Sequence, residues 1–150
     1  MYRIKGDTNL VTLVELLKDT KKETTKGLNK ALTDTAFDIQ KEAKKTVKDN
    51  HFKTGKLYKG IKAEVDLKKG EATITSTADY SSFVEFGTKP HTIRPKNKKA
   101  LRFYNRGKVV FTKEVRHPGT KGSFFLRSSV DNNTQKFIKR LEEAVSDGSN

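Results

Sequence analysis

A long helix is predicted over residues 22–47, because apolar or small residues recur there every three or four positions while lysines fill the positions between. Gly27 leaves open whether the first turns form a separate helix. A shorter stripe of the same kind predicts a helix over residues 9–18, with Asp7 or Thr8 as its cap. The stripe of the long helix consists of Leu28, Ala31, Leu32, Thr35, Ala36, Ile39, Ala43 and Val47.

From Ile61 the hydrophobic pattern changes to every second residue, which is typical of a half-buried strand. A matching run over 72–76 follows the turn at Lys69–Gly70, so the two runs predict a β-hairpin. A second hairpin is predicted around Arg106–Gly107. Its apolar positions alternate less regularly, as expected for strands that are covered on both sides or paired with another subunit.

A short helix is predicted over residues 79–86, between the two hairpins. Asp79 is its expected N-cap, and Gly87 is its expected C′ residue because glycine adopts a left-handed conformation without a Cβ penalty. A helix of this length is not stable alone and must pack on other elements. Its predicted apolar face consists of Tyr80, Phe83 and Val84.

The remaining boundaries follow from turn residues. Asp49 to Phe52 is expected to end the long helix, Thr54 to Leu57 to form a turn, and residues 117–122 to form a loop. A last helix is predicted after Leu126. Its expected buried face consists of Val130, Phe137, Ile138, Leu141 and Val145.

Helices at both ends with an antiparallel sheet between them predict an α+β fold. The chain has 150 residues, which suits a single domain over 1–150 with short flexible ends at about 1–8 and 146–150. Only 33% of the residues are hydrophobic, so one modest core is expected. The absence of cysteine excludes disulfides and thiolate metal sites. No apolar run has the length of a signal peptide or a membrane span, which favours a protein made in the cytoplasm with no membrane contact.

The formal net charge of +14 predicts an acidic partner, either nucleic acid or a negatively charged protein surface. A basic cluster follows Pro95 in a segment that the prolines keep extended. Such a segment suits contact with DNA phosphates or with an acidic partner, or packing across a neighbouring subunit; a solvated loop is the alternative. No run of aromatic residues accompanies it, which disfavours a sequence-specific nucleic-acid module. The cluster consists of Arg94, Lys96, Lys98, Lys99 and Arg102.

Candidate chemistry is sparse. His91 and His117 flank prolines at opposite ends of the second hairpin, so the fold is expected to allow them to meet. A histidine pair beside a lysine is able in principle to cleave RNA by general acid–base catalysis; two polar loop residues are the favoured interpretation. Glu85 is expected to be solvated or paired with Lys89. No metal-ligand spacing, nucleophile motif or phosphate loop is found in the sequence, and no cofactor is expected.

Three segments in order resemble a known family: TGKLYKGI, ADYSSFVEFGT and HPGTKGSFFLR. The chain resembles the head–tail joining, or tail-completion, proteins of long-tailed bacteriophages over roughly residues 10–145. Phe124 stands where the family commonly has proline, and Ser128–Ser129 replaces the usual Pro-Ala. The matching residues are Thr54, Gly55, Lys56, Leu57, Ile61, Asp79, Tyr80, Glu85, Phe86, Gly87, Thr88, His117, Pro118, Gly119, Thr120, Phe125, Leu126 and Arg127.

The resemblance implies a non-enzymatic virion protein at the head–tail junction, or neck, resembling tail-terminator subunits that assemble as a hexameric ring. The partners it implies are other copies of the chain, the head connector and the tail-tube or terminator proteins. A short aromatic helix and a proline-containing arm suit contact with a neighbouring subunit. A small basic nucleic-acid-binding protein is the alternative. The residues expected at the subunit or partner interface are Tyr80, Phe83, Phe86, Lys89, Pro90, His91, Arg94 and Phe124.

Overall fold

The computed structural model describes residues 22–51 and 55–147. The helix expected over residues 9–18 and the end at 1–8 lie outside the described residues, as do residues 148–150. The helices are α2 (Lys22–His51), α3 (Lys56–Gly60), α4 (Ser81–Phe86) and α5 (Phe125–Asp147). The strands are β1 (Ile61–Asp66), β2 (Glu71–Ser76), β3 (Gly87–Thr88), β4 (His91–Ile93), β5 (Leu101–Asn105), β6 (Lys108–Thr112), β7 (Val115–His117) and β8 (Thr120–Lys121).

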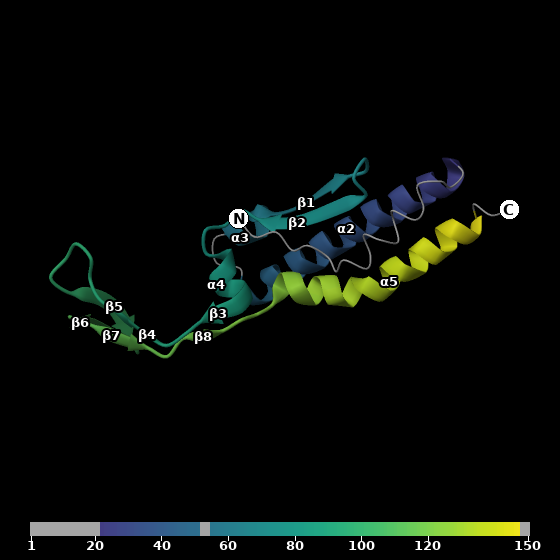
Figure 1. Ribbon diagram of the computed structural model, residues 1–150. Helices are drawn as coiled ribbons and strands as arrows, with labels where there is room; N and C mark the ends of the chain where they lie inside the picture. Colours follow the sequence, from purple (N-terminus) through teal and green to yellow (C-terminus); the bar gives the residue numbers. More distant parts are fainter. Residues whose placement is uncertain (1–21, 52–54, 148–150) are drawn as a thin grey trace.

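Two regions differ in shape (Figure 1). Residues 22–86 and 122–147, here called the body, contain the helices and the β1–β2 hairpin. Residues 87–121, here called the arm, form a two-stranded ribbon that projects from one end of the body (Figure 1). The α+β class and both predicted hairpins are confirmed. The hairpins do not join into one sheet, because every sheet of the described chain is two-stranded.

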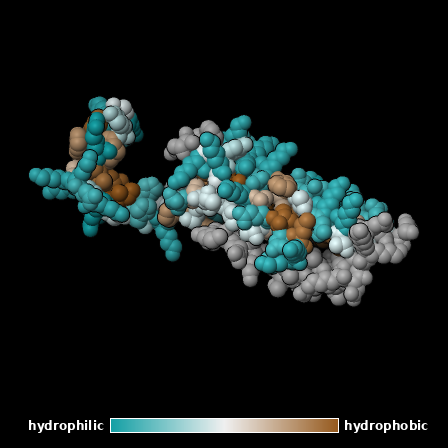
Figure 2. Space-filling view, turned by 90° about the horizontal axis from the view of Figure 1, so that it is seen from above, coloured by the Kyte–Doolittle hydropathy of each residue, from teal (hydrophilic) through white to brown (hydrophobic). Residues whose placement is uncertain are grey.

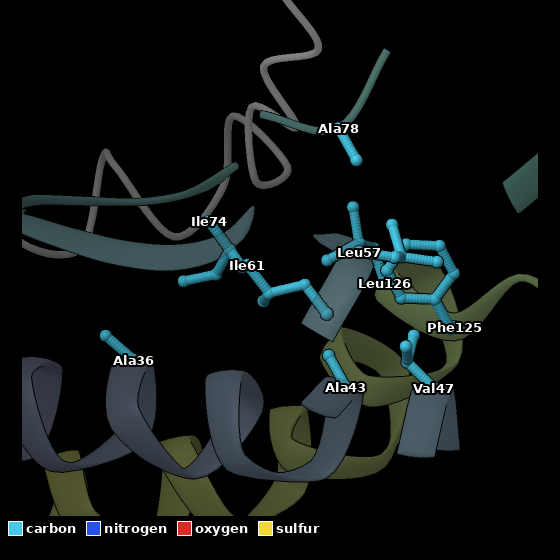
Figure 3. Packing of buried hydrophobic residues seen from close by; sticks show 9 residues of the cluster. All are labelled: Ala36, Ala43, Val47, Leu57, Ile61, Ile74, Ala78, Phe125 and Leu126. Atoms are coloured by element: carbon cyan, nitrogen blue, oxygen red, sulfur yellow. The ribbon is translucent and has the colours of Figure 1, made fainter. Parts of the chain in front are cut away.

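The main core lies between α2 and the β1–β2 hairpin (Figure 3). Ala36, Ala43 and Val47 of α2 point towards Ile61 and Ile74 of the hairpin (Figure 3). Small residues on α2 allow the sheet to approach closely, and the predicted stripe is thereby confirmed. The remaining residues of the cluster are Leu57, Ala78, Phe125 and Leu126.

A second cluster joins α2 to α5, which run antiparallel side by side (Figure 1). It consists of Leu28, Ala31 and Leu141, with Phe137 and Ala144 partly buried against them. A Cβ at Gly27 would lie 2.9 Å from the Cβ of Ala144, so the glycine permits this close approach. The structure therefore gives one continuous helix through Gly27.

Polar side chains also bind the two helices together. Asp38 of α2 accepts from Lys136 Nζ at 2.6 Å and from Arg140 Nη2 at 2.9 Å. Glu42 accepts from Asn132 and Asn133 at 2.6 and 2.7 Å. The Lys136 ammonium, which donates to Asp38, lowers the pKa of that carboxyl group. Because these bonds cross from one helix to the other, they fix the register of α5 along α2.

Several expected boundaries were wrong. α2 extends past the expected last residue, Val47, and ends at His51, within the segment Asp49 to Phe52 that was expected to end it. Of the turn expected at Thr54 to Leu57, Thr54 lies outside the described residues, and Lys56 and Leu57 instead begin α3, which is entered through Gly55 with φ +70°. Residues 117–122 are not a plain loop, since they include β8.

The expected buried face of α5 was partly wrong. Ile138 and Val145 are each 37% exposed. The polar residues Ser129 and Asn133 are buried in the contact with α2 instead. Asp147, expected at the start of the frayed end, and Ser146 belong to α5.

Candidate interaction surface

A buried carboxylate joins α4 to α5, the two elements of the body between which the arm leaves. Glu85 is 2% exposed and accepts hydrogen bonds from the backbone N–H groups of Leu126 at 2.9 Å and Arg127 at 3.0 Å. These amides are in the first turn of α5, where helices leave N–H groups without intrahelical partners and where a negative charge is favoured. Glu85 therefore caps α5 from a position about 40 residues earlier in the chain.

Two expectations for this region were wrong. Glu85 is neither solvated nor paired with Lys89. Asp79 does not cap α4, because Tyr80 occupies the N-cap position and makes no side-chain cap bond. Asp79 instead forms an ion pair of 2.8 Å with Lys56, which lowers the pKa of the Asp79 carboxyl group and raises that of Lys56. Glu85 is far in sequence from the start of α5, and Asp79 is far from Lys56. The local residue pattern therefore did not predict either interaction.

Glycines allow the outgoing and returning segments of the chain to lie close together where the arm leaves the body. Gly87 ends α4 as predicted, with φ +76° and ψ −169°, an extended conformation of positive φ rather than the left-handed helical one expected. A Cβ on it would lie 2.1 Å from the carbonyl oxygen of Thr120. A Cβ on Gly122 would lie 2.5 Å from the carbonyl oxygen of Glu85. Substituting a side chain at either position requires the backbone to move.

A patch of exposed aromatic side chains surrounds this attachment. Val84 alone of the predicted apolar face of α4 packs against the core, whereas Phe83 is 59% exposed and Tyr80 is also exposed. Phe83 therefore faces outward and not into the core. Phe86 and Phe124 are exposed and meet edge-to-face with ring centroids 6.3 Å apart. We call Tyr80, Phe83, Phe86 and Phe124 the root patch.

Phe124 has an unusual backbone, with φ +49°. A bulky residue rarely adopts positive φ, and such strain concentrates at functional positions. Its amide donates to the Glu85 carbonyl at 3.0 Å, which holds the chain in this conformation at the entry to α5. The fold thus presents an exposed phenyl ring at an energetic cost.

His91 and His117 meet, as the sequence analysis allowed, but they lie in strands and not in the expected loops. They are cross-strand partners in β4 and β7, and their rings stack with centroids 5.1 Å apart. His91 Nδ1 lies 2.8 Å from the carbonyl oxygen of Lys89, and His117 Nδ1 accepts from Gly119 N–H at 3.0 Å. Each ring therefore holds the turn next to it, Lys89–Pro90 or Pro118–Gly119, which favours the structural interpretation of the pair over RNA cleavage.

The basic cluster lies where the two strands of the arm differ in length. Between the pairs Ile93↔Val115 and Leu101↔Thr112, one strand has residues 94–100 and the other only 113–114. The extra residues place Lys96, Lys98 and Lys99 in an exposed loop. Arg94 does not project freely, because it binds Glu114 with Nε and Nη2 at 3.2 and 3.1 Å.

The end of the arm carries exposed apolar residues that the sequence analysis did not single out. Tyr104 is 70% exposed and Phe111 is 68% exposed, and Val109 is exposed beside them. They lie on the β5–β6 hairpin, here called the tip hairpin. The irregular apolar pattern of these strands was the signal, since apolar residues on both faces of a hairpin predict a covering partner.

Composition separates the arm from the rest of the molecule. None of residues 87–121, all of which the structure describes, is buried. The arm holds eleven of the 32 lysines and arginines and one of the 18 acidic residues, a formal net charge of +10 out of +14. In the view of Figure 2 it forms a separate lobe with hydrophobic residues at its surface between hydrophilic ones. The arm therefore has the surface of an interaction element rather than of a folded core.

No metal or membrane site is evident in the described residues. Within 22–51 and 55–147, no group of three or more His, Cys, Asp or Glu residues is placed to hold a metal ion. No helix in the same ranges is long and apolar enough to cross a membrane. An open polar hollow between α2 and α5 includes Asp38, Glu42 and Asn133, whose side chains already bond the two helices to each other.

The comparisons with known proteins agree with this structure. Searches of curated proteins and of solved structures returned no match. The sequence model of the family described as "Bacteriophage HK97-gp10, putative tail-component" matches residues 12–87, just over half of the chain. The match includes the first of the three motifs and the second up to Gly87, where the arm begins. It confirms the resemblance to a phage head–tail joining or tail-completion family. The chain therefore belongs to the HK97-gp10-like family of bacteriophage tail components.

Proposed function

We propose that the chain is a non-enzymatic structural subunit of the head–tail junction, a single domain that assembles with other copies into a ring. The observation that supports this most strongly is the root patch: four aromatic side chains exposed together at the base of a projecting arm. Exposed aromatic patches of this kind mark protein–protein contacts. A heterologous contact whose rotation closes produces a ring, and a hexamer is the size that the resemblance implies.

The expected interface residues fall in two groups around this patch. Tyr80, Phe83, Phe86 and Phe124 form the patch itself, while the other expected residues lie on the first part of the arm. The backbone strain at Phe124 is consistent with a role for its ring outside the isolated subunit. The residues on the arm are Lys89, Pro90, His91 and Arg94.

Light scattering and native mass spectrometry of the full chain test this proposal. The chain is measured alone and with the purified head-connector and tail-tube proteins of the same phage. We expect a defined oligomer, alone or with these partners. A chain that stays monomeric in every mixture contradicts the proposal.

A matched pair of variants shows whether the root patch makes the contact. Phe83→Ala is expected to weaken self-association about 30-fold, the effect of removing one hot-spot aromatic residue. Phe37→Ala is the control, because Phe37 is similarly exposed but lies on α2. Both variants should melt like the parent chain. Equal effects of the two changes on assembly contradict a contact at the root patch.

The Phe124→Gly variant tests whether the positive φ at Phe124 costs stability and whether its ring contributes to assembly. Glycine adopts positive φ without the penalty of about 1–2 kcal/mol that other residues incur. The variant should therefore unfold at higher denaturant concentration while assembling more weakly. A variant that assembles as well as the parent chain shows that the Phe124 ring does not contribute.

A further inference from the structure

One face of the tip hairpin combines apolar and cationic side chains. Arg102 pairs with Phe111 and Tyr104 pairs with Val109 across the two strands, and residues two positions apart share a face. The Arg102 guanidinium carbon lies 5.9 Å from the centroid of the Tyr104 ring. We call these four residues the tip surface.

The opposite face of the tip hairpin is also apolar. It carries Phe103 opposite Val110 and Leu101 opposite Thr112. No third strand and no helix pairs with or packs against this hairpin within the part of the chain that the structure describes. A two-stranded hairpin without such a covering element is marginally stable in water. The tip hairpin therefore gains stability when another molecule covers it.

The charge around the tip surface indicates the kind of molecule. The arm carries a formal net charge of +10, and its one acidic residue, Glu114, is already paired with Arg94. A second copy of the chain brings a further formal net charge of +14, so like charges oppose a contact between the tip surface and the arm of another copy. An acidic partner is complementary.

The apolar residues distinguish an acidic protein from DNA. Proteins hold duplex DNA mainly through its phosphates, with cations and polar groups. The apolar groups of Tyr104, Val109 and Phe111 do not make such contacts. Protein interfaces, in contrast, have an apolar centre rich in Tyr, Phe and Arg within a polar rim. The tip surface matches this second arrangement, with lysines and arginines as the rim.

The turn at the end of the tip hairpin points to the same conclusion. Arg106 and Gly107 both have positive φ, +48° and +78°, as in a type I′ turn. Asn or Gly is the usual first residue of such a turn, so arginine is locally unfavourable there. Its presence places a cation at the far end of the arm, where a partner is met first.

We propose that the tip surface docks on an acidic virion protein other than this chain, with Tyr104 and Phe111 in the apolar centre and Arg102 and Arg106 at the charged edge. This inference rests on the proposed function and names its partner class. It assigns self-association to the root patch and attachment of the ring to the tip surface.

Calorimetric titration of the full chain tests this inference against four probes: the head-connector protein, the tail-tube protein, a short duplex DNA and the chain itself. Tyr104→Ser/Phe111→Ser removes the apolar centre and keeps the charge. Arg102→Glu/Arg106→Glu reverses charge and keeps the centre. Arg106→Asn is the control for the turn, since asparagine suits positive φ while removing one charge. Ring formation by light scattering is recorded for every variant, so that failure of the ring and failure of docking are seen separately.

We expect the parent chain to bind the connector or the tail-tube protein. Each double variant should lower the affinity at least 30-fold and leave ring formation unchanged. Arg106→Asn should weaken binding less and leave the tip hairpin folded, as shown by its amide chemical shifts. Absence of binding to both proteins overturns the inference. The inference is also overturned if the chain binds DNA more tightly than either protein, with an affinity that falls steeply between about 50 and 200 mM salt and is unchanged in Tyr104→Ser/Phe111→Ser. Loss of the ring in the tip variants also overturns it.

Discussion

Different interactions stabilise the body and the arm. In the body, amphipathic helices bury a stripe against a hairpin, and Phe125, Leu57 and Ile61 are almost completely inaccessible. In the arm, 35 residues form three paired segments without one buried side chain. The arm is held by backbone pairing between its two strands and by close glycine contacts at its base. A chain with a low hydrophobic fraction has thus concentrated its core in one region and left the other exposed.

The family match follows the same division. It extends to Gly87 and so covers part of the body but not the arm. The matched part contains the core residues of α2, α3 and the β1–β2 hairpin.

The largest expected effect is the difference in stability loss between truncating a core side chain of the body and truncating an exposed side chain of the arm. Phe125→Ala removes a ring that is 0% exposed and should lower the free energy of unfolding by about 3–5 kcal/mol. Phe111→Ala, in the arm, should change the stability of the unassembled chain by less than about 0.5 kcal/mol. Urea unfolding followed by circular dichroism measures both. Similar losses for the two variants contradict the difference between the regions.

Gly87→Val strains the junction of the two regions. A β-branched residue resists positive φ, and its Cβ would meet the Thr120 carbonyl oxygen. Backbone strain and overpacking together should cost about 2–4 kcal/mol. The thermal melting temperature measures the change, and Gly107→Val is the control, since Gly107 also has positive φ but has open space around it. Equal losses at the two positions would show that backbone conformation alone is responsible.

Glu85→Ala removes the carboxylate that caps α5. Two charge-assisted hydrogen bonds to backbone amides are lost in a buried site, so about 1.5–3 kcal/mol of stability should be lost. Hydrogen exchange of the Leu126 and Arg127 amides should accelerate more than exchange within α2. Glu64→Ala, on the exposed face of β1, is the control. Unchanged exchange at the start of α5 rules out the capping role.

Asp38→Asn should have the smallest effect. The pKa of Asp38 is lowered by Lys136 and Arg140, so its contribution is fully present above the ordinary value of 3.8 and is lost as pH falls through the lowered value. Because these side chains are partly exposed to solvent, the loss at neutral pH should be under about 1 kcal/mol. Stability curves of the parent and the variant should converge below pH 3.8. Curves that stay parallel down to acid pH contradict this assignment.

The sequence was sufficient where local pattern determines structure. Helical periodicity predicted α2 and the position of α5, and alternation and turn glycines predicted both hairpins. These features depend on residues within one or two turns of each other. The net charge and the motif order likewise required no coordinates, and they were enough for the tail-component family.

Tertiary structure decided what each element faces. Glu85 is buried because the start of α5, about 40 residues later, supplies its partners, and Phe83 is exposed because Val84 takes the side that the core covers. The arm has no buried side chain, and its cationic strands pair only with each other within the described chain. A one-dimensional pattern specifies which residues share a face, but only the packing of distant segments determines whether that face meets the core, solvent or another protein.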